Sequence, residues 1–275
     1  MALRTDRRVS VSSWALHSLI GTVAPGRPGD PDARMMTENL PANPLPLLEV
    51  PAQLAAHGYR TMELCHFHLP TTDEAYLAEF RAAREEAGVE LWNLLVDDGD
   101  IVHPEYGNRD RDWVLGWADI GAALGARCMR VIGGKQPATP ETLTRSREQL
   151  LSLMVDAYVR GVRVMTENWF QTLSTPEAVQ EVLEPTNGSV GLCFDFGNWG
   201  GEDKYDKLQA IARFAESSHS KCNFVDGKPD VEDFTRCLDI LNDAGYSGPF
   251  TLVYGEPGQV WESLDQQREI VSRYL

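Results

Sequence analysis

Short apolar runs typical of β-strands alternate with longer amphipathic runs, and this alternation repeats eight times along the chain. Dividing its 275 residues by eight gives about 34 residues per repeat, the size of one strand–helix unit. The strand-like runs are continuously apolar, as expected of parallel strands covered on both faces. Strict alternation is typical of the α/β class. We therefore predict one (β/α)8 TIM barrel over residues 1–275, with strands at residues 9–14, 60–65, 89–96, 127–132, 162–166, 190–194, 217–225 and 249–254.

The predicted helices are bounded by residues that commonly begin or end helices. Gly125 follows a helix over residues 109–124, and Pro140 takes the first helical position after Thr139. A loop rich in Pro and Gly, residues 21–46, follows the first strand, and loops of this length are usually functional or mobile. A doubly wound sheet is disfavoured, because no GxGxxG or GxxxxGK[ST] motif follows the first strand. The other helices are predicted at residues 47–57, 72–87, 139–161, 174–184, 203–216, 230–244 and 260–274.

The charge balance excludes some classes of partner. With 25 basic and 41 acidic residues, the chain has a formal net charge of −16. It lacks the basic footprint that nucleic acids and anionic membranes require, so we expect neither as a partner. No run approaches the roughly 18 apolar residues of a membrane span. Five widely spaced cysteines form no CxxC pair, so we expect no disulfide framework and a cytoplasmic location.

Polar and aromatic residues gather where the predicted strands end. In a TIM barrel, the carboxyl ends of the strands carry the active site. Five of the six histidines fall at this rim, and only His57 lies at the opposite end. The rim is also acidic, which favours a neutral substrate over an anionic one. Its residues are Trp14, His17, Glu63, His66, His68, Asp97, Asp98, Asp100, His103, Arg130, Lys135, Glu167, Asn168, Trp169, Asp195, Asn198, Trp199, His219, Lys221, Tyr254 and Glu256.

Three of these residues end consecutive strands and can converge on one point: Glu167, Asp195 and His219. Their oxygen and nitrogen donors suit Mn, Mg, Zn or Fe(II). In the alternative interpretation, the carboxylates accept hydrogen bonds from loop amides and His219 is a satisfied core histidine. Tryptophans beside carboxylates and amides, such as Trp169 and Trp199, suit the apolar face and polar edge of a sugar ring.

Several short motifs, in this order, resemble the xylose isomerase-like TIM barrel superfamily along nearly the whole chain. They include Met62-Glu63-Leu64, Asp97-Asp98-Gly99-Asp100, Thr166-Glu167-Asn168, Phe194-Asp195-Phe196-Gly197-Asn198, His219-Ser220-Lys221 and Gly245-Tyr246-Ser247-Gly248-Pro249. The superfamily includes sugar isomerases and epimerases, inosose dehydratases and hydroxypyruvate isomerase. The resemblance implies a divalent metal (Mn, Mg, Zn or Co) held by Glu167, Asp195 and His219, and it makes a homodimer a reasonable expectation.

Two positions depart from the family pattern. The fourth ligand of the family, a glutamate on the last strand, corresponds to Val253 here, and Glu256 lies three residues later. The family histidine three residues after the aspartate of the sixth strand is replaced by Asn198. Epimerases of the family use two metal-linked glutamates as opposed acid and base, so the second role has no obvious holder in this chain.

These observations predict a metal-dependent isomerase or epimerase that removes a proton next to the carbonyl of a sugar, polyol or keto-sugar. Glu167 would be a ligand and the base, while Lys221 and Arg130 would polarise the carbonyl. The candidates for the missing acid or base are Glu256, Tyr254, Lys221, His66 and His68. A lyase or dehydratase with the same site and a non-catalytic sugar-binding barrel remain open, whereas an abasic-site endonuclease is disfavoured by the charge. The predicted substrate-binding residues are Trp14, His17, Glu63, His66, His68, Arg130, Asn168, Trp169, Asn198, Trp199 and Tyr254.

Overall fold

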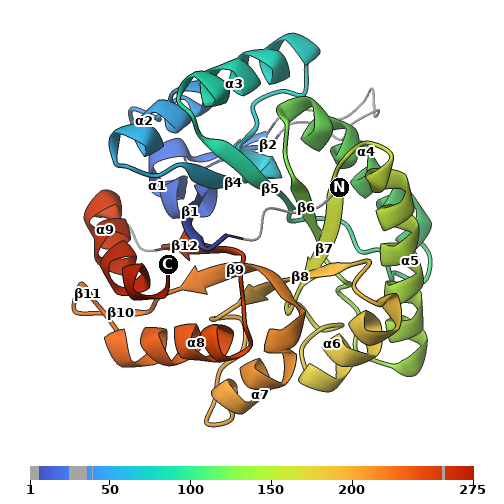
Figure 1. The fold of residues 1–275 in the computed structure, drawn as a ribbon. Coiled ribbons are helices and arrows are strands. Elements are labelled where there is room, and N and C mark those ends of the chain that lie inside the picture. Colours follow the sequence, from blue (N-terminus) through green and yellow to red (C-terminus); the bar gives the residue numbers. More distant parts are fainter. Residues whose placement is uncertain (1–5, 25–35, 39, 256–257) are drawn as a thin grey trace.

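Eight parallel strands close into a barrel in the computed structural model, which describes residues 6–24, 36–38, 40–255 and 258–275 (Figure 1). Each strand pairs in parallel with its neighbours, and the first strand closes the ring between the last strand and the second. Helices surround the barrel on the outside. The predicted TIM barrel is therefore confirmed. The barrel strands are β1 (Arg8–Ser12), β4 (Thr61–Cys65), β5 (Glu90–Val96), β6 (Cys128–Val131), β7 (Arg163–Glu167), β8 (Gly191–Asp195), β9 (Ala215–Lys221) and β12 (Pro249–Val253).

The helices begin and end close to the predicted residues. The Thr139 side chain accepts a hydrogen bond from the backbone N–H of Thr142, and Pro140 is the first helical residue. Gly125 ends its helix in the left-handed conformation, with φ of 77°. The α-helices are α1 (His17–Ile20), α2 (Val50–Ala56), α3 (Glu74–Glu86), α4 (Gly107–Leu124), α5 (Pro140–Tyr158), α6 (Pro176–Leu183), α7 (Lys204–Ile211), α8 (Val231–Asp243) and α9 (Val260–Val271).

Alternation along the strands decides which side chains enter the barrel. Because the side-chain period of a strand is two, Cys193 and Asp195 share one face of β8, and Ser217, His219 and Lys221 share one face of β9. Phe194 lies on the other face of β8 and packs in the core beneath the helices. The buried cluster of Trp92, Cys128, Met165 and Cys193 fills the barrel interior. On the inward face of each strand, the polar residues follow these apolar ones in sequence, so they lie at the carboxyl end of the barrel.

Three predicted segments differ from the structure. The loop over residues 21–46 contains a small antiparallel sheet of β2 (Thr22–Ala24) and β3 (Met36–Glu38). The helix predicted over residues 203–216 ends at Ile211, and β9 already begins at Ala215. The predicted strand over residues 217–225 ends at Lys221, and a separate hairpin follows, made of β10 (Phe224–Val225) and β11 (Lys228–Pro229). The sequence of β9 contains three serines and little apolar signal, which explains the misplaced boundary.

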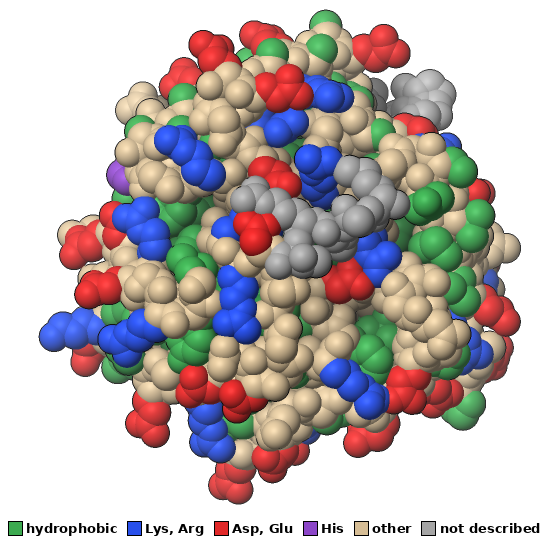
Figure 2. All heavy atoms as spheres, in the orientation of Figure 1, with side chains coloured by type: hydrophobic (Ala, Val, Ile, Leu, Met, Phe, Trp, Pro, Cys, Tyr) green, Lys and Arg blue, Asp and Glu red, His purple; other side chains and the backbone are tan. Residues whose placement is uncertain are grey.

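Charged side chains pair around the start of the strands. Arg8 lies 2.8 Å from Glu90, and Arg163 lies 2.5 Å from Glu216. Figure 2 shows basic and acidic side chains interspersed over the visible face rather than separated by sign. All five cysteines are buried free thiols, and within the described residues no helix is both long and apolar enough to cross a membrane.

Candidate metal centre

A cavity of about 230 Å³ lies at the carboxyl ends of the strands. All three predicted metal ligands line it, together with two cations and three aromatic side chains. The volume is below the roughly 300–1,000 Å³ of pockets for drug-sized ligands, so the cavity suits a small metabolite. Its lining residues are Ser12, Trp14, Cys65, Phe67, Leu95, Asp97, Arg130, Glu167, Trp169, Asp195, Asn198, His219, Lys221 and Val253.

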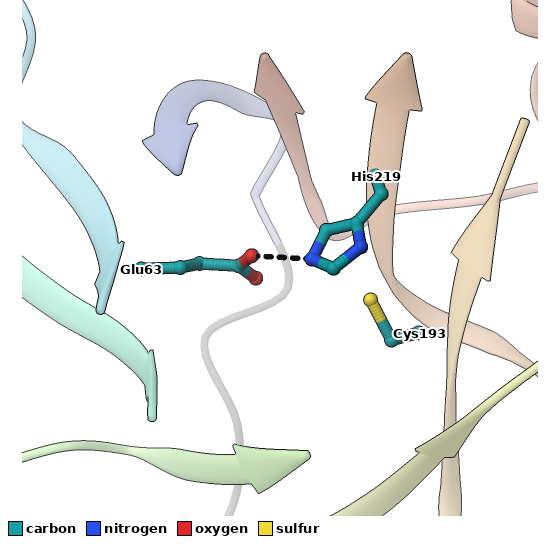
Figure 3. A group of neighbouring side chains, drawn as sticks. All are labelled: Glu63, Cys193 and His219. Carbon is teal, nitrogen blue, oxygen red and sulfur yellow. Dashed lines mark hydrogen bonds and ion pairs between the residues drawn. The ribbon is translucent and has the colours of Figure 1, made fainter. Parts of the chain in front are cut away.

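His219 stands at the centre of this arrangement because β9 directs its imidazole into the barrel. Its Nε2 lies 2.9 Å from Oε2 of Glu63, as Figure 3 shows. Its Nδ1 faces the other way and lies 3.5 Å from Oε1 of Glu167 and 3.6 Å from Oδ2 of Asp195. One ring nitrogen is therefore held by the protein, and the other faces two carboxylates.

Asp195 ends β8, and the turn after the strand fixes its carboxylate. Oδ1 accepts hydrogen bonds of 2.6 Å from the backbone N–H groups of both Gly197 and Asn198. The Asn168 side chain bonds to the backbone N–H and C=O of Asp195 at 2.8 and 3.0 Å. Because Oδ1 is held by the turn, Oδ2 is left to face His219.

Glu167 is oriented in a similar way by a buried arginine. Its Oε2 lies 2.9 Å from Nε of Arg130, whose other nitrogens donate to Oδ1 of Asp97 at 2.5 Å and to the backbone C=O of Val96 at 3.2 Å. Asn198 donates to Oε1 of Glu167 at 2.7 Å. Arg130 thus donates two hydrogen bonds to the protein and contacts Glu167 as an ion pair, without hydrogen-bond geometry between Nε and Oε2. It is therefore a support for Glu167 more than a free partner for substrate.

The three facing atoms fit a divalent cation. Metal–ligand distances of about 2.0–2.2 Å in a tetrahedral site separate neighbouring ligand atoms by about 3.4 Å. The Nδ1 to Oε1 and Nδ1 to Oδ2 distances of 3.5 and 3.6 Å agree with that spacing. All three side chains are buried, and their ligand atoms lie within 4.8 Å of one another. Glu167, Asp195 and His219 would hold the ion, and the cavity side would remain open to water or substrate.

Burial and charge shift the pKa values of this cluster in opposite directions. Burial alone would lower the pKa of His219, but the neighbouring Cys193, Glu167 and Glu63 outweigh it and raise that pKa well above its ordinary value. Burial alone would raise the pKa of Asp195, and hydrogen bonding to His219 reverses this, so that the pKa is lowered. The carboxylate of Asp195 is therefore ready to bind a cation.

The acidic rim is largely compensated within the protein. Burial would raise the pKa of Asp97, but the Arg130 guanidinium overrides it and holds that pKa well below its usual range. Asp98 pairs with Lys135 at 2.9 Å. Asp100 accepts hydrogen bonds from backbone N–H groups, including that of Lys135 at 3.0 Å. The charge of the rim therefore no longer favours a neutral substrate over an anionic one.

A second set of possible ligands, Glu63, Cys193 and His219, lies deeper in the barrel (Figure 3). Burial raises the pKa of the Cys193 thiol to about 12. Both oxygens of Glu63 already accept hydrogen bonds, from Ser217 and from His219. The deeper set shares His219 with the first set, and Glu63 contacts the ring nitrogen that faces away from Glu167 and Asp195.

The structure brings part of the predicted site together and separates the rest. Trp14, Arg130, Trp169, Asn198 and Lys221 line the cavity with the three metal ligands, and Glu256 lies outside the described residues. The side chain of Lys221 makes no hydrogen bond or ion pair with another described residue, although its charge helps to lower the pKa of Asp195. Other predicted substrate-binding residues do not line the cavity, namely His17, Glu63, His66, His68, Asn168, Trp199 and Tyr254.

The two histidines nearest the first strand form a chain of hydrogen bonds beside the cavity. His68 lies 2.8 Å from Oγ of Ser13 through Nδ1 and 3.0 Å from Nδ1 of His17 through Nε2. The His17 ring stacks on Trp14, with ring centroids 4.9 Å apart. This chain supports Trp14, which is 41% exposed and does line the cavity.

Several lining residues were not predicted as site residues. Ser12, Cys65 and Leu95 occupy inward positions near strand ends, and Phe67 lies between the two rim histidines His66 and His68. The inward periodicity of the strands could have identified the first three. Phe67 gave no such indication, because it follows its strand in a 3-10 turn.

Comparisons with known proteins agree with the fold. The sequence profile described as the xylose isomerase-like TIM barrel matches residues 51–270. A putative hydroxypyruvate isomerase from Streptomyces coelicolor is 27% identical over 253 residues, covering 78% of this chain and 87% of the relative.

Solved structures share the fold at low sequence identity. An L-ribulose 3-epimerase superposes with a TM-score of 0.72 at 15% identity, covering 97% of this chain and 94% of the other. A xylose isomerase-like TIM barrel protein from Mycobacterium smegmatis, in complex with magnesium, gives a TM-score of 0.65 at 15% identity, with coverage of 92% and 96%.

Proposed function

Because the chain belongs to the xylose isomerase-like TIM barrel family, we propose that it is a divalent-metal-dependent isomerase of a small hydroxy-ketone or keto-sugar. One observation carries this proposal. Oε1 of Glu167, Oδ2 of Asp195 and Nδ1 of His219 face one another at the base of a cavity. The protein holds Oδ1 of Asp195 and Nε2 of His219 by hydrogen bonds, and it pairs Oε2 of Glu167 with Arg130. The proposed reaction moves a proton between carbons next to a carbonyl.

The cavity supports a small substrate with polar and apolar sides. Trp14, Phe67 and Trp169 contribute aromatic surface, while Asn198 and Lys221 contribute polar groups. The name of the Streptomyces coelicolor relative points to hydroxypyruvate, and the structural neighbours act on keto-sugars according to their names. Both kinds of compound carry a carbonyl next to a hydroxyl-bearing carbon, so both belong in the test.

Each polar side chain of the cavity has a distinct role in this proposal. A metal ion would polarise the carbonyl oxygen of the substrate. Glu167 takes the proton from the neighbouring carbon, while Arg130 keeps its carboxylate oriented. Lys221 places an ammonium group in the cavity and stabilises the negative charge that develops on oxygen. Gly197 leaves room for it, since a Cβ there would lie 2.5 Å from Cδ of Lys221.

Val253 favours isomerisation over epimerisation. Epimerisation at one carbon needs an acid and a base on opposite faces of the substrate, whereas transfer between adjacent carbons can use one base on one face. Val253 lines the cavity where the family pattern has its second glutamate. The described residues thus offer Glu167 as the base and no opposed glutamate.

The same observation supports a second candidate, a lyase or dehydratase on an oxidised sugar. Elimination also requires one base, and a separate acid protonates the leaving group. Lys221 is the candidate acid in the described part of the cavity. The two reactions differ in their products, so one experiment separates them.

The test combines metal analysis with NMR of the products in D2O. Purified protein is analysed for Mg, Mn, Zn and Co, then incubated with hydroxypyruvate and a panel of keto-sugars. Deuterium at one carbon of an isomerised product supports the proposal, and loss of water or an aglycone supports the lyase. Glu167→Gln should abolish turnover. Full activity of that variant would reject the proposal. If the protein binds a sugar but holds no metal and shows no turnover, the proposal is also rejected, and a sugar-binding barrel is indicated.

A further inference from the structure

Glu63 is a fully buried carboxylate on the inner face of the barrel, behind His219 as seen from the cavity. Its exposed fraction is 0%, and it is not among the residues that line the cavity. Figure 3 shows its carboxylate directed at the imidazole of His219. A substrate in the cavity therefore meets His219, while Glu63 acts through that ring.

The hydrogen bonds around Glu63 have a defined direction. The indole Nε1–H of Trp92 can only donate, and it donates to Oγ of Ser217 at 3.0 Å. The Ser217 hydroxyl is then free to donate its own hydrogen to Oε1 of Glu63, at 3.0 Å. Asn93 donates to the same oxygen at 3.4 Å. Oε1 is therefore saturated by donors, and Oε2 is directed to His219.

The direction of these hydrogen bonds determines which nitrogen of the His219 ring carries the hydrogen. An ionised carboxylate only accepts hydrogen bonds, so Nε2 of His219 must carry the hydrogen of the 2.9 Å contact with Glu63. In the neutral ring, the lone pair then lies on Nδ1, the atom that faces Glu167 and Asp195. A metal ion needs that lone pair.

We propose that Glu63 is a positioning residue that fixes the tautomer and ring orientation of His219 for metal binding. The inference rests on the proposed metal-dependent function and goes beyond it by assigning this role to a residue outside the cavity. Partners of this kind orient metal-ligating histidines in many proteins, and their loss commonly weakens metal binding about 10- to 100-fold.

The charge of Glu63 supports the same role. Its only ion pair within the described part of the chain is the one with His219. A buried carboxylate is costly unless a positive charge compensates it. The His219 ring lies between Glu63 and the metal position, so a bound cation would supply that charge through the ring. Metal binding and burial of Glu63 should therefore favour each other.

Two variants and one control test the proposal. Glu63→Ala removes the acceptor, whereas Glu63→Gln keeps an oxygen acceptor for His219 without the charge. Thr251→Val is the matched control, because Thr251 pairs with His219 across the strands and its buried Oγ1 has no hydrogen-bond partner among the described residues. Thermal unfolding of each metal-free variant confirms that it is folded.

Two measurements are made on the metal-free, full-length protein. Calorimetric titration with Zn²⁺ and Mn²⁺ measures metal affinity. ¹⁵N NMR of the histidine side chains, recorded at a pH high enough for the His219 ring to be neutral, reports its tautomer. We expect Glu63→Ala to bind metal about 10- to 100-fold more weakly and to lose the Nε2–H tautomer. Glu63→Gln should keep that tautomer and lose less affinity, and Thr251→Val should stay within about twofold of wild type.

The outcomes separate this inference from the proposed function. If wild type binds metal and both Glu63 variants match it within twofold, the positioning role is wrong and the metal-dependent function stands. If only Glu63→Ala fails to fold, Glu63→Gln still tests the proposal. An unchanged metal affinity in Glu63→Gln together with a changed tautomer of His219 contradicts it. Absence of metal binding in wild type would overturn both the function and the inference.

Discussion

Nε of Arg130 lies 2.9 Å from Oε2 of Glu167, and both side chains are buried at the floor of the cavity. On its other side, Arg130 pairs with Asp97 at 2.5 Å. One guanidinium thus compensates two buried carboxylates. The position of Glu167 depends on this arginine as much as on its own strand.

Arg130→Met should therefore destabilise the protein strongly. The variant keeps much of the side-chain volume but leaves Asp97 and Glu167 without their cation. Removing one partner of a buried pair typically costs about 3–5 kcal/mol, because the remaining charge is uncompensated. Chemical denaturation of the metal-free protein measures this loss.

Arg81→Met is the matched control. Arg81 lies 2.9 Å from Glu85 on the exposed face of α3, and exposed helical pairs of this spacing contribute about 0.3–0.5 kcal/mol. Similar losses in the two variants would contradict the role assigned to the buried pair.

Metal removal should lower the melting temperature in a way that depends on Glu167. An ion at 100 times its Kd stabilises the folded state by about 2.7 kcal/mol. For a chain of this length, that corresponds to a rise of about 5–10 °C. We expect calorimetric scans to show this rise when Mn²⁺ or Zn²⁺ is added after treatment with EDTA.

Two variants show whether that rise comes from the proposed centre. Glu167→Gln should abolish it, and Glu148→Gln, on the exposed face of α5, should keep it. An equal rise in both would place the metal elsewhere.

The fold could be predicted because its determinants are local. Gly125, and Thr139 followed by Pro140, mark helix ends in the sequence, and continuous apolar runs mark most strands. β9 was harder to place, because its serines are buried in hydrogen bonds on both faces. Ser218 and Ser220 lie 3.0 Å apart on the outer face, and Ser217 donates to Glu63 on the inner face. Such a strand has little apolar signal, so its first residues were assigned to the preceding helix.

The convergence of the candidate metal ligands could be predicted for a different reason. Glu167 and Asp195 are the last residues of neighbouring strands, and a closed barrel brings such residues together. The role of Glu63 could not be predicted in this way, because it depends on the register that places His219 opposite it inside the barrel. Asn168 and Asn198 look equivalent in sequence, yet one holds the backbone of Asp195 and the other lines the cavity.

Acid should destabilise the protein in part through His68. Burial is the main reason that the pKa of His68 falls from 6.5 to about 3 in the folded state. Between these two values, the unfolded chain binds a proton that the folded chain does not, so stability falls as the pH falls. Lowering the pH from 7 to 5 should cost about 2 kcal/mol through this residue.

Urea denaturation at pH 7 and pH 5 measures this contribution. His68→Asn removes the titrating group, so its stability should fall by about 2 kcal/mol less than that of wild type over this interval. The variant is also expected to be less stable at both pH values, because it loses contacts with Ser13 and His17. The same dependence on pH in wild type and His68→Asn would show that the pKa of His68 in the folded protein equals its value in the unfolded chain.

Val253→Glu should restore the fourth ligand of the family pattern and tighten metal binding. Val253 lines the cavity at the end of β12 and pairs with Lys221 across the strands. A carboxylate there would add a negative oxygen donor next to Glu167 and Asp195, and we expect at least about a tenfold gain in affinity, or about 1.4 kcal/mol. Without metal, the same carboxylate is repelled by its neighbours, so the metal-free variant should melt below wild type.

Val253→Gln, which matches the new side chain in size but not in charge, should gain much less affinity. Equal affinities of wild type and Val253→Glu in calorimetric titration would mean that residue 253 cannot reach the metal. The metal would then have no open coordination position facing Val253.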